Sequence, residues 1–223
     1  MIDFHSHTFF SDGALSPAEH IRRAVVAGYK AIGLTDHVDF SNIEFVYNSL
    51  VGFVESMRVI DMPITIIPGI EITHVPPKLI EKIVAKAKDM KIPLIVIHGE
   101  SPVEPVEEGT NRAAIESCVD ILAHPGLIKE EDVKRATELG VSLEITVRRG
   151  HSLTNGYVAK MAKKYNTKLV LDSDAHSYDD FLKDYLRQKV MVGCGMEPVQ
   201  ILELEENMKL LLESIKKRMC IKM

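Results

Sequence analysis

The sequence predicts an α/β fold in which repeated strand and helix units form a barrel with a metal site at the carboxyl ends of its strands. Short apolar runs of strand type alternate with longer segments of helical type. The runs begin about 20–35 residues apart, which is the size of a βα unit. Most are continuously apolar, as in Leu94-Ile95-Val96-Ile97, and such runs are typical of parallel strands covered on both faces. Metal-capable side chains follow nearly every run.

Seven strands are predicted, with helices between them. The first helix is expected over residues 17–27, because Ser16 suits the N-cap, Pro17 the first helical position and Glu19 the third position after the cap. Gly28 is its expected stop. The predicted strands are Ile2–His5, Ala31–Thr35, Ile64–Pro68, Leu94–His98, Ile121–Ala123, Ser142–Thr146 and Leu169–Asp172. The other crossover helices are expected at Ile43–Ile60, Lys78–Met90, Asn111–Cys118, Glu130–Leu139 and Thr154–Lys164.

After the seventh strand the chain is expected to be helical to its end. Residues 179–194 are ambiguous, because Val190-Met191-Val192 could form a short strand. Residues 198–218 form an amphipathic pattern with an apolar stripe and a basic end, which suits a helix packing on the barrel. No linker or low-complexity segment interrupts the sequence, so we expect one domain over residues 1–223.

Composition narrows the classes of function. The chain has 223 residues, 46% of them hydrophobic and 26% charged, and its net charge is −5. This balance is typical of a soluble globular protein, and the acidic charge argues against general binding to nucleic acid or anionic membranes. No apolar run approaches the ~20 residues that span a bilayer, and no secretory signal is visible at the start. The three widely spaced cysteines favour reduced thiols and a cytoplasmic location.

The placement of polar residues favours a barrel over an open sheet. An open sheet gathers its site at one or two switch points, whereas a barrel gathers it from the ends of many strands. Here the strand ends are followed by six histidines and two carboxylates: His5, His7, His37, Glu71, His98, His124, Asp174 and His176. Asp12 is a candidate third carboxylate. His20 is expected on a helix surface, and His74 and His151 lie in loops near the site without a pattern behind them.

Nine candidate ligands are too many for one ion. At about three or four ligands each they would serve two or three divalent cations. Mixed imidazole and carboxylate ligation suits zinc, manganese or iron better than magnesium or calcium.

The motifs around these residues resemble those of the PHP family, the polymerase and histidinol phosphatase superfamily. They occur in the family's order over about the first 180 residues. The matching segments are Asp3-Phe4-His5-Ser6-His7, Ser11-Asp12-Gly13, Gly33-Leu34-Thr35-Asp36-His37, Pro68-Gly69-Ile70-Glu71, Ile97-His98-Gly99, Leu122-Ala123-His124-Pro125-Gly126 and Asp172-Ser173-Asp174-Ala175-His176. The resemblance implies a distorted (βα)7 barrel, similar to a TIM barrel.

The resemblance also implies three metal sites. The first would be held by His5, His7, Glu71 and Asp174, the second by Glu71, His98 and His124, and the third by Asp12, His37 and His176. Many family members carry histidine where this chain has Asp12. Among these ligands, Glu71, Asp174 and His176 are the expected catalytic residues. Asp3 and Asp36 are candidates either to orient ligating imidazoles or to form local hydrogen bonds.

These expectations predict a metal-dependent hydrolase that acts on phosphoester bonds. A metal-bound hydroxide would attack phosphorus in a small phosphomonoester such as histidinol phosphate. The alternatives are a nucleotide phosphatase or short-oligonucleotide exonuclease of the same family and, in another class, a non-catalytic barrel subunit or scaffold. Arg148 and Arg149, which follow the sixth strand, are candidates to bind the substrate phosphate, and Arg112 is a further candidate. The sequence does not predict an oligomeric state.

Overall fold

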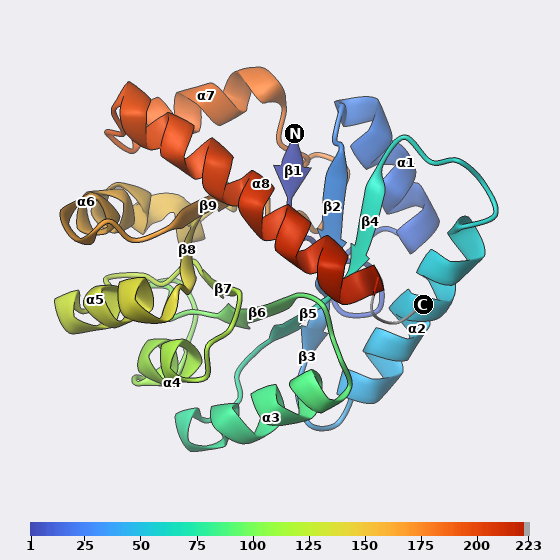
Figure 1. Ribbon diagram of the computed structural model, residues 1–223, viewed down its shortest axis with the longest axis horizontal. Helices are drawn as coiled ribbons and strands as arrows, with labels where there is room; N and C mark the ends of the chain where they lie inside the picture. The colour runs from blue at the N-terminus through green and yellow to red at the C-terminus, as the bar shows by residue number, and fades with distance from the viewer. Residues whose placement is uncertain (221–223) are drawn as a thin grey trace.

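The computed structural model describes residues 1–220, in which parallel strands form two sheets surrounded by helices (Figure 1). Every pair of neighbouring strands is parallel. The first sheet has the order β1 (Ile2–Asp3), β2 (Ala31–Leu34), β4 (Thr65–Pro68). The second has the order β3 (His37–Val38), β5 (Ile70–Ile72), β6 (Ile95–His98), β7 (Ile121–Ala123), β8 (Ser142–Thr146), β9 (Leu169–Asp172).

Two breaks explain why seven predicted strands appear as nine. The second predicted strand continues from β2 into β3 through Thr35 and Asp36, and the third continues from β4 into β5 through Gly69. A Cβ atom at Gly69 would lie 2.9 Å from Thr35 Cγ2 and 3.0 Å from the Leu94 carbonyl oxygen, so only glycine lets the three strands approach here.

Backbone hydrogen bonds connect the last strand to the first. The Asp174 amide donates to the His5 carbonyl at 2.9 Å, and the His7 amide donates to the Ala175 carbonyl at 2.8 Å. With the breaks between β2 and β3 and between β4 and β5, these bonds make the predicted strands a distorted parallel barrel. The predicted α/β fold class is confirmed.

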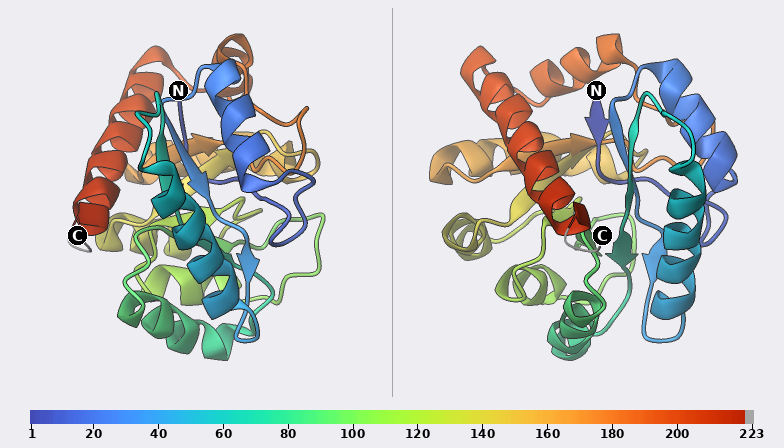
Figure 2. Two further views of the ribbon diagram at one scale, coloured as in Figure 1. Left: turned by 90° about the vertical axis from the view of Figure 1, so that its right-hand side faces the viewer. Right: turned by 45° about the vertical axis from the view of Figure 1, so that its right-hand side comes forward.

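The helices lie outside the strands, on the flanks of the barrel (Figure 2). Ser16 Oγ accepts a hydrogen bond from the Glu19 amide at 3.3 Å, and Gly28 ends the first helix with φ of 89°, both as predicted. A short 3₁₀ turn, η1, covers His151–Thr154. The helices are α1 (Pro17–Ala27), α2 (Ile43–Met57), α3 (Pro77–Asp89), α4 (Thr110–Glu116), α5 (Glu130–Leu139), α6 (Asn155–Tyr165), α7 (Asp184–Gly193) and α8 (Pro198–Cys220).

The structure decides one segment that the sequence left open, and it shows that the expectation for His20 was wrong. Val190–Val192 is not a strand but part of α7, where Met191 is fully buried while Val192 is 63% exposed. His20 is not on a helix surface: it is fully buried, and its Nε2 lies 2.9 Å from Ser6 Oγ. Its spacing from Pro17 and Ala24, which are also buried, places His20 on the inner face of α1.

Helix α8 crosses the amino ends of the strands (Figure 1). Asn207 Nδ2 donates to the carbonyl of Leu169, the first residue of β9, at 2.8 Å. The Arg218 guanidinium pairs at 2.8 Å with Asp120, which immediately precedes β7. The carboxyl ends of the strands are therefore at the opposite, uncovered side of the barrel. Within residues 1–220, no helix is both long and apolar enough to cross a membrane.

Candidate metal centre

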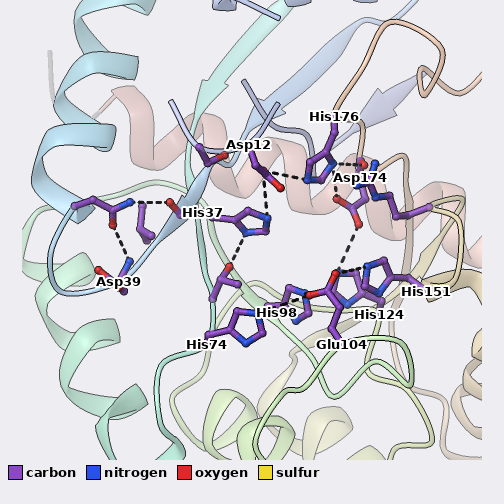
Figure 3. Close-up of a pocket in the computed structure, with 15 residues that line it drawn as sticks. Asp12, His37, Asp39, His74, His98, Glu104, His124, His151, Asp174 and His176 are labelled. Atoms are coloured by element: carbon purple, nitrogen blue, oxygen red, sulfur yellow. Dashed lines mark hydrogen bonds and ion pairs between the residues drawn. The ribbon is translucent and has the colours of Figure 1, made fainter. Parts of the chain in front are cut away.

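The carboxyl ends of the strands bring all nine predicted ligands to one side of the barrel. The parallel register places His37 of β3 directly beside Glu71 of β5, and His98 ends β6. A pocket of about 460 Å³ opens here, lined by polar side chains from several loops (Figure 3). Its walls include six of the predicted ligands: Asp12, His37, His98, His124, Asp174 and His176.

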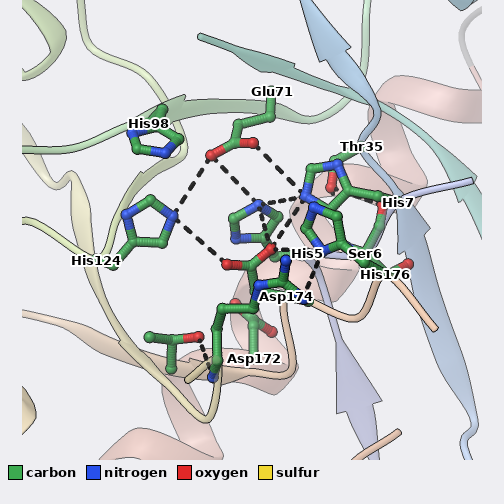
Figure 4. A network of polar contacts seen from close by, with 12 residues as sticks. His5, Ser6, His7, Thr35, Glu71, His98, His124, Asp172, Asp174 and His176 are labelled. Carbon is green, nitrogen blue, oxygen red and sulfur yellow. Dashed lines mark hydrogen bonds and ion pairs between the residues drawn. The ribbon is translucent and has the colours of Figure 1, made fainter. Parts of the chain in front are cut away.

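The inner group consists of His5, His7, Glu71, His124 and Asp174, all of them buried (Figure 4). One oxygen of Glu71 lies 3.3 Å from His5 Nε2 and 3.7 Å from His124 Nε2. Asp174 lies 3.2 Å from His7 Nε2 and 3.6 Å from His124 Nε2. The two carboxylates therefore face each other across a set of imidazole nitrogens.

The positions of the protons in the inner group suit a bound cation. His5 Nδ1 lies 2.7 Å from Glu144 Oε1, so in the neutral ring this nitrogen carries the proton. His5 Nε2 is then unprotonated and has a free lone pair. That lone pair faces His7 Nε2 at 3.1 Å and the Glu71 carboxylate. Glu71 Oε1 is buried and has no hydrogen-bond donor. A buried cluster of acceptors without donors is costly unless a positive charge lies among them.

The pKa values of the inner group indicate the same charge pattern. Burial opposes charge on His5, but the carboxylates of Glu71, Glu144 and Asp174 outweigh burial and raise its pKa well above the usual value. Burial likewise opposes ionisation of Glu71, yet His5 and His37 hold its pKa well below its usual value. Burial lowers the pKa of His7, and His37 and His176 lower it further. In the absence of metal, protons supply the positive charge.

The outer group consists of Asp12, His37 and His176 and lies nearer the solvent. Asp12 Oδ1 is 3.5 Å from His37 Nε2 and 3.2 Å from His176 Nε2. The Asp12 side chain is 57% exposed, whereas His176 is 11% exposed. Burial opposes charge on His37, but Glu71, whose Oε2 lies 2.6 Å away, raises its pKa to about 9. Although burial opposes ionisation of Asp12, the two imidazoles lower its pKa.

Two ligand candidates have an unusual backbone. His124 and Asp174 have φ of 27° and 51°, in the left-handed region that residues other than glycine rarely adopt. Such conformations cost about 1–3 kcal/mol and cluster at functional sites. Here they turn both side chains into the inner group.

The structure adds two residues that sequence reasoning missed, Glu144 and Glu104, and brings His151, which was expected only in a loop near the site, to the pocket. Glu144 of β8 is fully buried, contacts His5 and accepts a hydrogen bond from the His124 amide at 2.9 Å. Glu104, in the loop between β6 and α4, and His151, in η1, both reach the pocket. A charged residue inside an otherwise buried strand is a signal that could have found Glu144. The two loop residues carry no comparable signal.

The two candidate orienting carboxylates accept hydrogen bonds from backbone amides instead of contacting a candidate imidazole ligand. Asp3 accepts from the amides of His5 and Ser173, at 3.1 and 3.2 Å. Asp36 accepts from the amides of Thr8 and Ser11, at 2.8 and 3.1 Å. Both therefore fix the loops that carry the ligands, and Glu144 is the carboxylate that contacts a ligating imidazole.

The three candidate arginines occupy different places. Arg148 lines the pocket and lies 3.5 Å from Asp180. Arg149 is exposed and is not among the residues lining the pocket. Arg112 pairs with Asp132 of α5 and is also absent from the pocket wall. The structure thus brings one of the three to the site.

Comparisons with known proteins give a family and a set of relatives. The PHP domain family matches residues 3–217. An uncharacterized protein of Methanocaldococcus jannaschii is 46% identical over 195 residues, covering 87% of this chain and 89% of its own length. Ribonuclease P protein component 3 of Methanosarcina mazei is 30% identical, covering 90% of this chain and 83% of its own length. A probable phosphatase of Clostridium novyi is 30% identical, covering 79% of each chain.

Solved structures share the fold. A chain in the structure of archaeal ribonuclease P with mature tRNA gives a TM-score of 0.70 at 19% identity, covering 98% of this chain and 91% of its own. The histidinol phosphate phosphatase of Lactococcus lactis, in complex with zinc, L-histidinol and phosphate, gives a TM-score of 0.62 at 16% identity. It covers 88% of this chain and 94% of its own.

Proposed function

The chain belongs to the PHP family, and from this premise we propose that it is a metal-dependent phosphatase acting on a small phosphomonoester, such as a histidinol-phosphate-like compound. The observation that carries the proposal is the inner group: a buried set of imidazoles and carboxylates in which Glu71 Oε1 has no hydrogen-bond donor. Two or three divalent cations, of zinc, manganese or iron, would be held by the inner and outer groups together with His98. When bound, they activate water and neutralise phosphoryl oxygens.

The residues of the chain have distinct tasks in this proposal. Glu71 and Asp174 would hold the ions, and the contact of Glu144 with His5 Nδ1 would fix the tautomer of that imidazole. His176 lies between the two groups, 3.4 Å from Asp174 and 3.2 Å from Asp12, so it borders the reacting centre. Arg148 projects from the loop after β8 and would bind the substrate phosphate as a charged fork.

The dimensions of the pocket support a small substrate. Its volume of about 460 Å³ lies in the range of pockets for metabolites. A nucleotide or the end of a short oligonucleotide remains the alternative substrate within the same reaction class. The probable phosphatase of Clostridium novyi supports phosphatase activity in general and does not distinguish these substrates.

A second candidate function is a protein subunit of a ribonucleoprotein. The likeness to ribonuclease P protein component 3, in sequence and in fold, favours it. A scaffold of this kind needs no buried cation site, and the net charge of −5 disfavours a broad RNA-binding face. The gathering of all nine predicted ligands at the carboxyl ends of the strands, six of them in the pocket wall, is the reason to place the enzyme first.

One experiment tests the enzyme directly. Protein purified without chelator is analysed for metals and screened against phosphorylated metabolites, nucleotides and short oligonucleotides, with manganese, zinc or iron restored. We expect two to three ions per chain and hydrolysis of a small phosphomonoester that chelator abolishes. Protein that holds less than one ion after reconstitution would contradict the proposal. Tight binding of RNA with no hydrolysis would favour the second candidate.

A further inference from the structure

A carboxylate from a loop reaches two imidazoles at the edge of the pocket. Glu104 Oε2 lies 3.0 Å from His98 Nε2, and Glu104 Oε1 lies 3.2 Å from His151 Nε2 (Figure 3). The loop of residues 99–109 joins β6 to α4 and carries Glu104 to this position. His98 and His151 are buried, while Glu104 is 38% exposed.

The hydrogen bonds of the two imidazoles leave a place for a cation. His98 Nδ1 lies 3.0 Å from the Gly99 carbonyl oxygen, which only accepts, so this nitrogen carries the proton in the neutral ring. His98 Nε2 is then unprotonated, and its lone pair faces the carboxylate of Glu104. His151 Nδ1 lies 2.6 Å from Ser101 Oγ, which fixes the ring with Nε2 toward Glu104.

The position adjoins the second predicted metal site. The His124 ring stacks on His151 at 4.1 Å and lies edge to face with His98 at 4.4 Å. One ring nitrogen from each of these three histidines lies within 4.8 Å of the others. Three imidazoles with a further oxygen ligand are a common arrangement around zinc.

We propose that Glu104 and His151 are additional ligands of the ion assigned above to His98 and His124, an inference that rests on the proposed function. The ion then connects β6, β7, η1 and the 99–109 loop, and it fixes that loop at the edge of the pocket. The loop after β8, which supplies no ligand in the scheme expected from sequence, supplies one through His151.

The test measures binding of Co²⁺ and needs no substrate. Metal-free wild-type protein is titrated with Co²⁺ while its visible absorption is recorded, and its affinity is measured by competition with a chelator. The variants are Glu104→Gln and His151→Asn. The matched control is Glu107→Gln, an exposed carboxylate of the same loop that is not among the residues lining the pocket.

We expect each variant to bind one ion roughly 10- to 100-fold more weakly than the wild type, with a changed cobalt spectrum, because a ligand is lost. Co²⁺ should also slow proteolysis of the 99–109 loop in the wild type but not in Glu104→Gln. The control should match the wild type in affinity, spectrum and protection.

The outcomes separate this inference from the proposed function. If the wild type binds ions and both variants match it in affinity and spectrum, Glu104 and His151 are not ligands, and the proposed function stands. If the wild type binds no metal, both proposals fail. Should His151→Asn fail to fold, Glu104→Gln decides alone, since its partly exposed side chain can be exchanged without disturbing the core.

Discussion

The inner and outer groups use the same kinds of side chain but differ in their surroundings. The inner group is buried, and a carboxylate outside it, Glu144, fixes one of its imidazoles. The outer group depends on Asp12, whose side chain is 57% exposed. A buried ligand set is ordered before an ion arrives, whereas an exposed carboxylate is free to move. The inner group is therefore suited to holding ions permanently and the outer group to exchanging one.

The sharpest test of this comparison is to remove a carboxylate from each group. Glu71 contacts imidazoles of both groups, so Glu71→Gln should lower kcat/KM by at least ~100-fold. Asp12→Ala should cost roughly 10-fold, because only the outer ion loses a ligand. Both are measured on a phosphomonoester with metal analysis of the same samples. A greater loss from Asp12→Ala in folded protein would reverse the assignment of the two groups.

A second test concerns the arginine nearest the inner group. Arg148 lines the pocket and its charge contributes to lowering the pKa of Asp174, which burial raises overall. Losing a charge-assisted contact costs about 1.5–3 kcal/mol, so Arg148→Ala should lower kcat/KM roughly 10- to 150-fold with metal content unchanged.

Arg149→Ala is the matched control for this change, because Arg149 is exposed and does not line the pocket. We expect it to keep wild-type kcat/KM. Equal losses in the two variants would mean that the loop as a whole, rather than one guanidinium, supports the site.

Glu144 tests how the inner group is fixed. Glu144→Gln keeps the volume of the side chain but removes the charge that fixes His5 Nδ1. Metal affinity should fall about 10- to 100-fold, the range for partners that orient a ligating histidine. The measurement is a chelator competition, with a thermal melt to verify folding. Unchanged affinity would show that the charge of Glu144 is not needed to order His5.

The pH dependence of metal binding by the outer group gives a further test. His37 has a pKa of about 9, so below that pH an incoming ion must displace its proton. Affinity for the outer ion should rise by up to about tenfold per pH unit from pH 7 toward 9 and then level off. Mn²⁺ titrations across this range measure it. Equal affinity at pH 7 and pH 9 would contradict the role of His37 as a ligand.

The parts of this molecule that could be predicted from the sequence are those marked by a repeating pattern of apolar residues. Continuous apolar runs mark the parallel strands, and residues that end them, such as Glu71 and His98, meet at one side because parallel strands share a direction. The breaks at Asp36 and Gly69 were not predicted, since they depend on how three strands approach one another. The contact between Glu104 and His151 was not predicted for a similar reason. Their loops are far apart in sequence, and only the fold brings the two side chains to 3.2 Å from each other.

Helix α8 has a practical consequence for anyone handling this protein. It lies across the amino ends of the strands (Figure 1), and the pocket lies at their carboxyl ends. A tether attached to the exposed face of α8, for example at Leu210, would therefore hold the molecule on a sensor chip or resin with its pocket facing away from the support. Immobilised in this orientation, the barrel could be rinsed with chelator and recharged with one cation after another on a single sample.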